Sequence, residues 1–366
     1  MVDSELKKLF ALEFMGVVAG IALRASTAFN VVTSFQYVAM LTLGFSLGRA
    51  IISFFAPQLA ERKGSYVAAA GFFFLFVLSV AYMFMPRNLY WLLRIPHGAA
   101  SGLSWPALQA LVIGKSTPRN RAKVSASYFL VGMLATGFGY AISGFKVVRP
   151  IMVSAILFLI VSLGLFRLRT GVESWKKGVK GKKVLDISAT SVFLSAFSLG
   201  LLMTILNTEI TLAVLYNLVG RVFAAIVMAL ASTIGALLGY VLGHHLLDVR
   251  QSLVSLAMPG YFTSMSSLGI ISNEPRIAAV SVALAQAGMT WWRSSNMALA
   301  RTGKDTGMRL GLDNMGRNLG TTVSSLMLVL GGSIVDIILI SSVLFTIALS
   351  GGGISSLVRR WRTHHI

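Results

Sequence analysis

Cysteine is absent from the 366-residue chain, and acidic residues are scarce, with 12 Asp and Glu against 32 Lys and Arg. Without cysteine the chain has no disulfide, no thiolate metal ligand and no cysteine nucleophile. Its five histidines are scattered without the spacing of metal ligands. We therefore expect neither a metal site nor a cofactor.

Charged residues of both signs are also few, at 12% of the chain, whereas a soluble domain carries roughly 25%. Hydrophobic residues make up 55%, and the mean hydropathy is +0.77. Because a membrane-spanning helix needs about 20 apolar residues, the length allows about twelve spans with short loops. The runs are apolar all round, without the alternation of barrel strands. The sequence thus predicts an all-α polytopic membrane protein with about twelve transmembrane helices.

The apolar runs between polar breaks place the expected spans along the whole chain. They lie near residues 9–30, 35–57, 66–85, 89–113, 123–144, 150–166, 187–213, 220–243, 252–271, 276–299, 309–330 and 333–350. Sorting the basic residues onto alternating sides puts 22 on the side of the N-terminus and 5 on the other, with the rest inside spans. Since cytoplasmic loops are rich in Lys and Arg, we expect both termini to be cytoplasmic in a multi-pass protein of the cell membrane. The net charge of +20 then reflects topology, and we expect no nucleic-acid partner.

The longest polar stretch, residues 167–186, holds seven of these bases and divides the chain near its middle. We expect an N-terminal six-helix bundle in residues 1–166 and a C-terminal bundle in 187–366 with a short basic tail. The stretch is interpreted as a cytoplasmic linker attracted to anionic lipid headgroups, with a regulatory or nucleic-acid-binding role as the alternative. An internal repeat supports the duplication, because residues 58–65 match residues 245–252 in kind at an offset of 187.

Two motifs of the first half resemble those of the major facilitator superfamily. Residues 57–64, Pro-Gln-Leu-Ala-Glu-Arg-Lys-Gly, are similar to its loop motif Gly-x-Leu-Ala-Asp-Arg-x-Gly, with Pro57 as the departure. Residues 94–98, Arg-Ile-Pro-His-Gly, resemble its Arg-x-x-Gln-Gly pattern in the fourth span, with His97 in place of Gln. The basic loop at 115–123 and a glycine-rich fifth span agree with the family, but the Gly-Pro pair of drug antiporters is missing.

The resemblance implies two six-helix bundles around a central cavity that opens alternately to each side. Spans one, four, seven and ten line this cavity in the family, and the loop after span two acts as a gate latch. Carried onto this chain, the latch residues are Glu61, Arg62 and Gly64, with Asp248 and Arg250 in the repeated loop of the second half. The alternative is topogenic charge with a tight turn.

Ionisable side chains at membrane depth cost at least about 2.5–3.5 kcal/mol, so each should face the interior and have a partner or a role. The candidates for the substrate cavity fall on the four helices expected to line it: Arg24, Arg94, His97, Asn207, Glu209, Trp291 and Arg293. Three arginines against one glutamate favour an anionic solute, because guanidinium binds carboxylate or phosphate with two parallel hydrogen bonds.

The repeat offset sets Arg24 and Glu209 at equivalent depths, where they could pair across the cavity. A structural ion pair, a substrate contact and proton carriage by Glu209 remain open. We interpret Arg94 as a helix-orienting or proton-linked residue. Trp291 and its neighbour could stack on Arg293 or on a planar solute, although packing alone also explains the tryptophans.

Two further pairs of charges are expected to be structural. Asp313 and Arg317 lie four residues apart on one helix face, and we interpret them as structural or related to a gate. Glu13 and Arg49, in the first two spans, are expected to serve packing and not substrate binding.

The sequence thus favours a secondary active transporter of a small organic solute, leaning anionic and driven by protons or another coupling ion. It is expected to be monomeric in the lipid bilayer. A multidrug/proton antiporter is the first alternative, and a non-transporting membrane scaffold or receptor is the second. The chain has no Gly-x-x-x-x-Gly-Lys-Ser/Thr loop for a nucleotide and no visible catalytic constellation, so we do not expect an enzyme.

Overall fold

The computed structural model describes residues 4–32, 34–117, 120–145, 149–169, 189–206, 209–249, 254–300 and 306–348. These residues form helices joined by turns and short loops, and they contain no strand. For the described part of the chain, the all-helical architecture expected from the apolar composition is confirmed.

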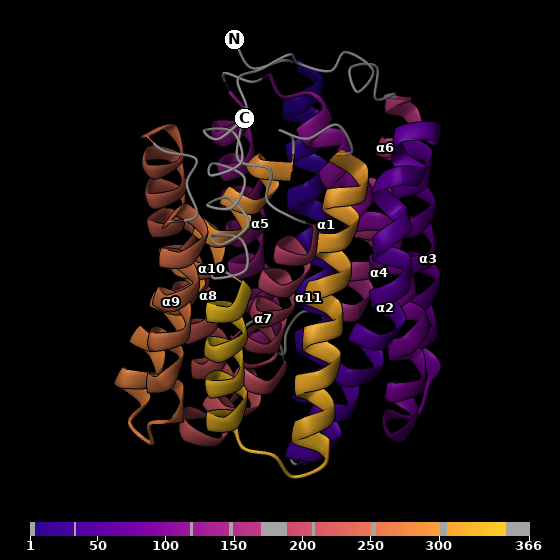
Figure 1. Cartoon of the computed structure of the whole chain (residues 1–366). Coiled ribbons are helices and arrows are strands. Elements are labelled where there is room, and N and C mark those ends of the chain that lie inside the picture. Colours follow the sequence, from indigo (N-terminus) through magenta and orange to yellow (C-terminus); the bar gives the residue numbers. More distant parts are fainter. Residues whose placement is uncertain are drawn as a thin grey trace, which may run out of the picture.

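The helices run roughly along one common axis, as Figure 1 shows. Those of the first half are α1 (Ser4–Phe29), α2 (Phe35–Lys63), α3 (Ser65–Phe84), η1 (Arg87–Leu89), α4 (Tyr90–Gly114), α5 (Arg121–Gly144) and α6 (Pro150–Leu168). Those of the second half are α7 (Ala189–Leu206), α8 (Glu209–Val249), α9 (Val254–Ser267), η2 (Leu268–Ile271), α10 (Pro275–Ala300) and α11 (Thr306–Val329), followed by an apolar helix at Ile334–Ala348.

By length and composition, six helical stretches of the described residues could cross a membrane. They are α1, α2, α3, α5, α6 and the stretch Val192–Gly243. Helices α4, α10 and α11 are long enough but carry more polar side chains, many of them buried. The chain is therefore a multi-pass membrane protein, and the count of about twelve spans stays a prediction.

The described residues of the expected seventh and eighth spans are all helical. They form α7 (Ala189–Leu206) and α8 (Glu209–Val249). Helix α8 is itself bent at Gly220, whose backbone has φ 76° and ψ 174°. Only glycine adopts such angles readily, because it lacks a Cβ atom. The expected boundary between the seventh and eighth spans, at residues 213–220, thus falls at Gly220.

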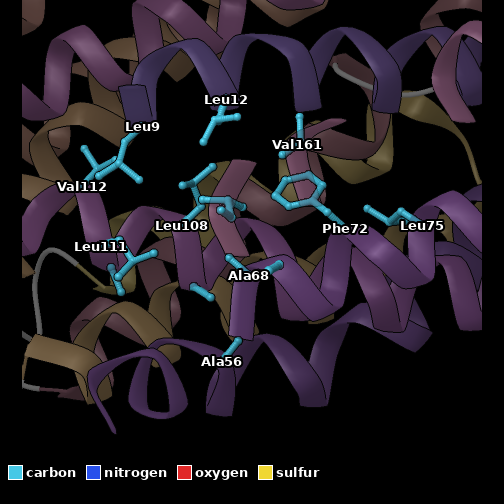
Figure 2. Close-up of a cluster of buried hydrophobic side chains, with 14 of the residues drawn as sticks. Leu9, Leu12, Ala56, Ala68, Phe72, Leu75, Leu108, Leu111, Val112 and Val161 are labelled. Carbon is cyan, nitrogen blue, oxygen red and sulfur yellow. The ribbon is translucent and has the colours of Figure 1, made fainter. Parts of the chain in front are cut away.

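Apolar side chains hold the first six helices together. Helix α1 packs against α5 and α6, α2 against α4, and α3 against α4 and α6. Figure 2 shows part of the resulting core, in which Leu9, Phe72 and Leu108 are fully buried. In the second half, α7 packs against α11, and α10 against α8 and α9. The two halves meet where α2 contacts α11 and where α5 contacts α8 and α10.

Glycines bring α2 and α4 into direct backbone contact. A Cβ atom on Gly48 of α2 would overlap the carbonyl of Ile95, and one on Gly98 of α4 would overlap the carbonyl of Phe45. Small residues at such crossings let helices in a membrane approach closely. Gly98 is the last residue of the Arg-Ile-Pro-His-Gly motif, and its lack of a side chain permits this close crossing. The crossing in turn holds the motif's arginine and histidine against α2.

A tight junction joins α2 to α3 at Gly64. This residue has φ 62° and ψ −145°, and its N–H donates to the carbonyl of Ala60 at 2.8 Å. Pro57, the departure from the family motif, lies inside α2 without ending it. Gly64 therefore makes a turn that a side chain would strain, while its role in a latch stays a prediction.

Candidate functional site

Side-chain contacts define the two ends of the molecule. The start of α1 and the end of α4 lie together at one end, which we call the Glu5 end. There the Lys115 ammonium, just after α4, lies 2.7 Å from the Glu5 carboxylate of α1. At the opposite Ser34 end, α2 begins, and the Tyr37 hydroxyl donates to the carbonyl of Arg87 at 2.9 Å. The candidate site lies between these ends.

Glu209 is the centre of a buried ion cluster toward the Ser34 end. Arg24 of α1 donates from Nε and Nη2 to the two Glu209 oxygens, at 3.1 and 2.9 Å. Nη2 of Arg94, in α4, lies 2.9 Å from Oε1, and the Thr42 hydroxyl of α2 donates to Oε2 at 3.2 Å. Three helices of the first half thus converge on one residue of the second.

The ion pair between Arg24 and Glu209, which the sequence left open, is present in the structure. The repeat offset had placed both residues at equivalent depths, and that placement agrees with their contact. Arg94 is fully buried, and its Nη2 also donates to the Thr27 hydroxyl at 2.6 Å. Its motif neighbour His97 lies edge-on to the Phe45 ring, with the ring centroids 5.2 Å apart. Arg94 therefore ties α4 to α1 and α8.

A cavity of about 140 Å³ lies beside this cluster. Its lining includes charged and aromatic side chains from both halves: Glu13, Arg24, Arg49, Arg293, Phe45, Trp105, Tyr128 and Phe129. The remaining lining residues are mostly small or polar, among them Thr42, Ser46, Ser101, Thr136 and Asn318. Helices α1, α2, α4, α5, α7, α10 and α11 all contribute to the lining.

The sequence-predicted cavity residues divide into three groups. Arg24, His97 and Arg293 line the cavity. Arg94 and Glu209 lie behind its wall in the ion cluster, while Trp291 is buried among helices and is not part of the lining. Asn207 lies outside the described residues.

Among the described residues, the aromatic ring beside the Arg293 guanidinium is that of Phe129, and not that of a neighbouring tryptophan. Its guanidinium carbon lies 4.8 Å from the ring centroid of Phe129 in α5. Successive residues of a helix point about 100° apart, so Trp291 and Trp292 face other sides of α10. Trp292 is fully buried in the helix packing. The aromatic partner of Arg293 thus comes from the other half of the chain.

Arg49 also lines the cavity, although the sequence assigned it to packing with Glu13. The described residues offer neither Arg49 nor Arg293 an ion-pair partner within 4.0 Å, and the buried Nε atom of each has no hydrogen-bond partner there. The Arg49 guanidinium carbon lies 5.8 Å from the ring centroid of Phe45. The cavity therefore holds two guanidinium groups that have no ion-pair partner within 4.0 Å among the described residues.

Glu13 does not pair with Arg49 either, and both face the cavity. It is 2% exposed, and its Oε2 atom has no hydrogen-bond partner among the described residues. A signal for this placement exists in the sequence, since Glu13, Val17, Gly20 and Arg24 follow a helical repeat. All four line the cavity. Reading the helical face of α1 from Arg24 would have found Glu13.

Helix α11 contains the predicted pair of Asp313 and Arg317, joined at 2.7 Å. Asp313 also accepts a hydrogen bond from the Asn296 amide of α10, and Arg317 donates to the Asn314 side chain at 2.9 Å. These contacts bury the pair in the second half of the chain. Whether the pair also acts in a gate stays a prediction.

A ladder of polar side chains on α11 contacts the first half. Asn314 donates to Gln109 of α4 at 3.0 Å, Asn318 to Ser53 of α2 at 3.0 Å, and Thr322 to Ser46 of α2 at 3.0 Å. Because the three residues are four apart, they lie on one face of the helix. We call these three contacts the α11 ladder. Its Asn314 and Asn318 contacts lie toward the Glu5 end, since α4 ends there and α11 begins beside the end of α2.

Comparison with known proteins places the chain in a family. The sequence profile of the Major Facilitator Superfamily matches residues 9–325. The chain belongs to the major facilitator superfamily. Members of this superfamily carry small-molecule solutes and are, in general, not enzymes. The resemblance carried by the two sequence motifs is thereby confirmed.

Two solved structures of superfamily transporters share the fold. The human organic anion transporter MFSD10 (TETRAN) aligns with a TM-score of 0.67 and 11% identity, over 95% of this chain and 99% of that one. The nucleoside transporter NupG, solved as a point mutant, aligns with a TM-score of 0.64 and 12% identity, over 95% and 98%. A search of curated proteins by sequence found no match. At these identities the likeness establishes the fold.

The superfamily loop motif lies at the Glu5 end. Glu61 is half-buried and Arg62 is exposed. A Cβ atom on Gly307, in the first turn of α11, would overlap the Glu61 carboxylate, so the motif touches the second half of the chain. The repeated loop cannot be compared, since the Asp248 side chain and Arg250 lie outside the described residues. Among the described residues, no group of three or more His, Cys, Asp or Glu could hold a metal ion.

Proposed function

We propose that this superfamily member is a secondary active transporter of a small organic anion. It works by alternating access between two six-helix bundles, residues 1–166 and 187–366, joined by the basic segment 167–186. We place it in the cell membrane as a monomer of about twelve spans with cytoplasmic termini. One observation carries the substrate class: Arg49 of α2 and Arg293 of α10 face one cavity, and neither has an ion-pair partner within 4.0 Å among the described residues.

The energetics of buried charge support this assignment. A guanidinium group removed from water needs a negative partner, because an unpaired buried charge is strongly unfavourable. Arg24 has Glu209 as its partner, whereas Arg49 and Arg293 have none among the described residues. A carboxylate, sulfonate or phosphate group between them would supply the missing charge and accept paired N–H hydrogen bonds. The bound solute would thus complete the site.

The remaining lining and the cavity volume limit the solute. Rings of Phe45, Trp105 and Phe129 give the cavity flat apolar walls beside the two guanidinium groups. A volume of about 140 Å³ lies below the roughly 300–1,000 Å³ of sites for drug-sized ligands. A small anion with one ring or a short chain matches both features.

Alternating access is supported by contacts on both sides of the cavity. Toward the Ser34 end, the Glu209 cluster connects α8 to α1, α2 and α4. Toward the Glu5 end, the α11 ladder connects α11 to α2 and α4. Breaking one set while keeping the other would open the cavity to one side only. In this proposal Glu61, Arg62 and Gly64 latch the Glu5 end, and Asp248 and Arg250 have the corresponding role in the repeated loop.

The two fold neighbours are named for organic anions and for nucleosides. Because both neighbours have low sequence identity to this chain, we base the choice between these solutes on the cavity arginines and not on the neighbours. The principal alternative is export of organic cations in exchange for protons. The observation that favours it is Glu13, an acid without a described partner in an aromatic-walled cavity.

Three probes of similar shape test the substrate class. Purified protein is heated with benzenesulfonate, with neutral benzenesulfonamide or with cationic phenyltrimethylammonium, and the unfolding temperature is recorded. A ligand at 100 times its Kd adds about 2.7 kcal/mol to the free energy of unfolding. We expect stabilisation by the anion alone. Stabilisation by the cation alone would establish the alternative.

Charge-removing variants locate the binding site. Arg49→Gln and Arg293→Gln should each abolish the stabilisation by benzenesulfonate. Arg221→Gln is the matched control, because Arg221 donates to the carbonyl of Ser143 at 2.9 Å and does not line the cavity. Equal anion binding by the wild type and the Arg293→Gln variant would refute the site.

A further inference from the structure

Two glutamates of the described residues are deeply buried, and they differ in their surroundings. Glu209 accepts two hydrogen bonds from Arg24 and one from Thr42, and it forms an ion pair with Arg94. Glu13 is equally buried and faces the cavity, but it has no ion pair within 4.0 Å among the described residues. A carboxylate fixed by two guanidinium groups is poorly suited to exchange protons. Glu13 has no such contacts to break.

We propose that Glu13 takes up one proton when the organic anion binds between Arg49 and Arg293, so that anion and proton cross the membrane together. This inference rests on the proposed function. It moves the coupling role, which the sequence had offered for Glu209, to a residue that the sequence had assigned to packing.

Several titratable groups face Glu13 or share its cavity. They come from every polar wall around it: Tyr128 of α5, Arg293 of α10, Arg49 of α2, His97 of α4 and Arg24 of α1 itself. Helix α6, which also packs against α1, presents the apolar side chains of Phe158, Val161 and Leu165. Helix α8 contributes Glu209, which is already held by arginines. Glu13 is therefore the one carboxylate among the described lining residues of the cavity.

The position of Glu13 along α1 separates it from the Arg24–Glu209 pair. Eleven residues at about 1.5 Å each place the two levels roughly 16 Å apart along the helix. On the α5 side, the backbone of Gly132 comes close, since a Cβ atom there would lie 3.0 Å from Glu13 Oε1. The carboxylate is thus held at the cavity wall by packing, with its second oxygen free of described partners.

Electrostatic repulsion links the anion to the proton. In the cavity without solute, the positive charges of Arg49 and Arg293 favour the ionised form of Glu13. A bound anion offsets these positive charges and adds a negative charge to the same low-dielectric space, so it favours the protonated form of Glu13. If the solute is the anion of a strong acid, the proton comes from water to the Glu13 carboxylate and leaves it after the anion is released.

Benzenesulfonate is a suitable probe, because it stays ionised and any proton taken up must reside on the protein. Wild-type protein is reconstituted into liposomes, and uptake driven by an inward proton gradient is compared with exchange of internal for external probe without a gradient. We expect Glu13→Gln to retain exchange and to lose gradient-driven accumulation. Glu5→Gln, on the same helix and outside the cavity, should retain both.

The outcomes separate the two proposals. If the wild type neither exchanges nor accumulates the probe, the proposed function fails. If the wild type accumulates it and Glu13→Gln does so equally well, the role of Glu13 is wrong. A second measurement needs no variant: adding benzenesulfonate to wild-type protein in weakly buffered micelles should raise the pH by the uptake of one proton per bound anion. Binding without proton uptake would overturn the inference.

Discussion

Removal of the Glu209 charge should destabilise the protein more than any other isosteric change near the cavity. In Glu209→Gln, the side-chain shape is kept, but Arg24 and Arg94 lose their shared counter-ion. Their side chains are 16% and 0% exposed, so water does not replace it. Breaking a buried ion pair by removing one partner costs about 3–5 kcal/mol. We expect a loss of this size in the free energy of unfolding.

Equilibrium unfolding by SDS titration in mixed micelles, followed by circular dichroism, measures this loss. Thr42→Val is the comparison, because it removes a single hydrogen bond to the same carboxylate and should cost less, about 1.5–3 kcal/mol. The double variant Arg24→Gln/Glu209→Gln removes both charges of one pair. Its loss in the free energy of unfolding should therefore be smaller than the sum of the losses in Arg24→Gln and Glu209→Gln. A loss under about 1 kcal/mol in Glu209→Gln, or strict additivity in the double variant, would refute the buried cluster.

Three further predictions concern helix packing. Gly98→Ala should prevent stable folding, because its Cβ would overlap the α2 backbone. Gly243→Ala is the control and should be tolerated, because the nearest atom to its Cβ lies at 3.4 Å. The yield of monodisperse protein should therefore fall for Gly98→Ala and not for Gly243→Ala. Gly64→Ala should lower stability by roughly 1–3 kcal/mol through backbone strain, and unchanged stability in the same SDS titration would contradict the turn. Asn318→Leu should weaken the contact with Ser53 and favour states open at the Glu5 end, which faster labelling of a cysteine introduced on that side would reveal.

The sequence predicted those parts of the fold that depend on local pattern. Long apolar runs and loop charges indicated the helices, and the motifs around Glu61 and Arg94 indicated the superfamily. The repeat offset placed Arg24 and Glu209 at one depth. These features are local or periodic, so one chain suffices to find them. The bend at Gly220 could be placed only as a boundary, since glycine is common throughout these helices.

The composition of the cavity was less accessible to sequence reasoning. Spans one, four, seven and ten were expected to line it, yet α2 and α5 supply Arg49, Tyr128 and Phe129. Which helix face turns inward depends on how α2 and α4 cross, and backbone contacts at Gly48 and Gly98 set that crossing. The pairing of Arg293 with a ring of α5 likewise depends on contacts between the halves. Such contacts join residues far apart in sequence, so no local pattern predicts them.

Protection of a cavity thiol tests the central claim most directly, namely that an organic anion occupies the space between Arg49 and Arg293. The chain has no cysteine, so Ser101→Cys, in the cavity lining, introduces one thiol without background. Its rate of modification by a methanethiosulfonate reagent is measured with and without benzenesulfonate. We expect the anion to slow modification, benzenesulfonamide to have no effect, and Arg293→Gln to abolish the protection. Equal rates with and without the anion, at a concentration that stabilises the protein, would place the anion elsewhere and contradict the account.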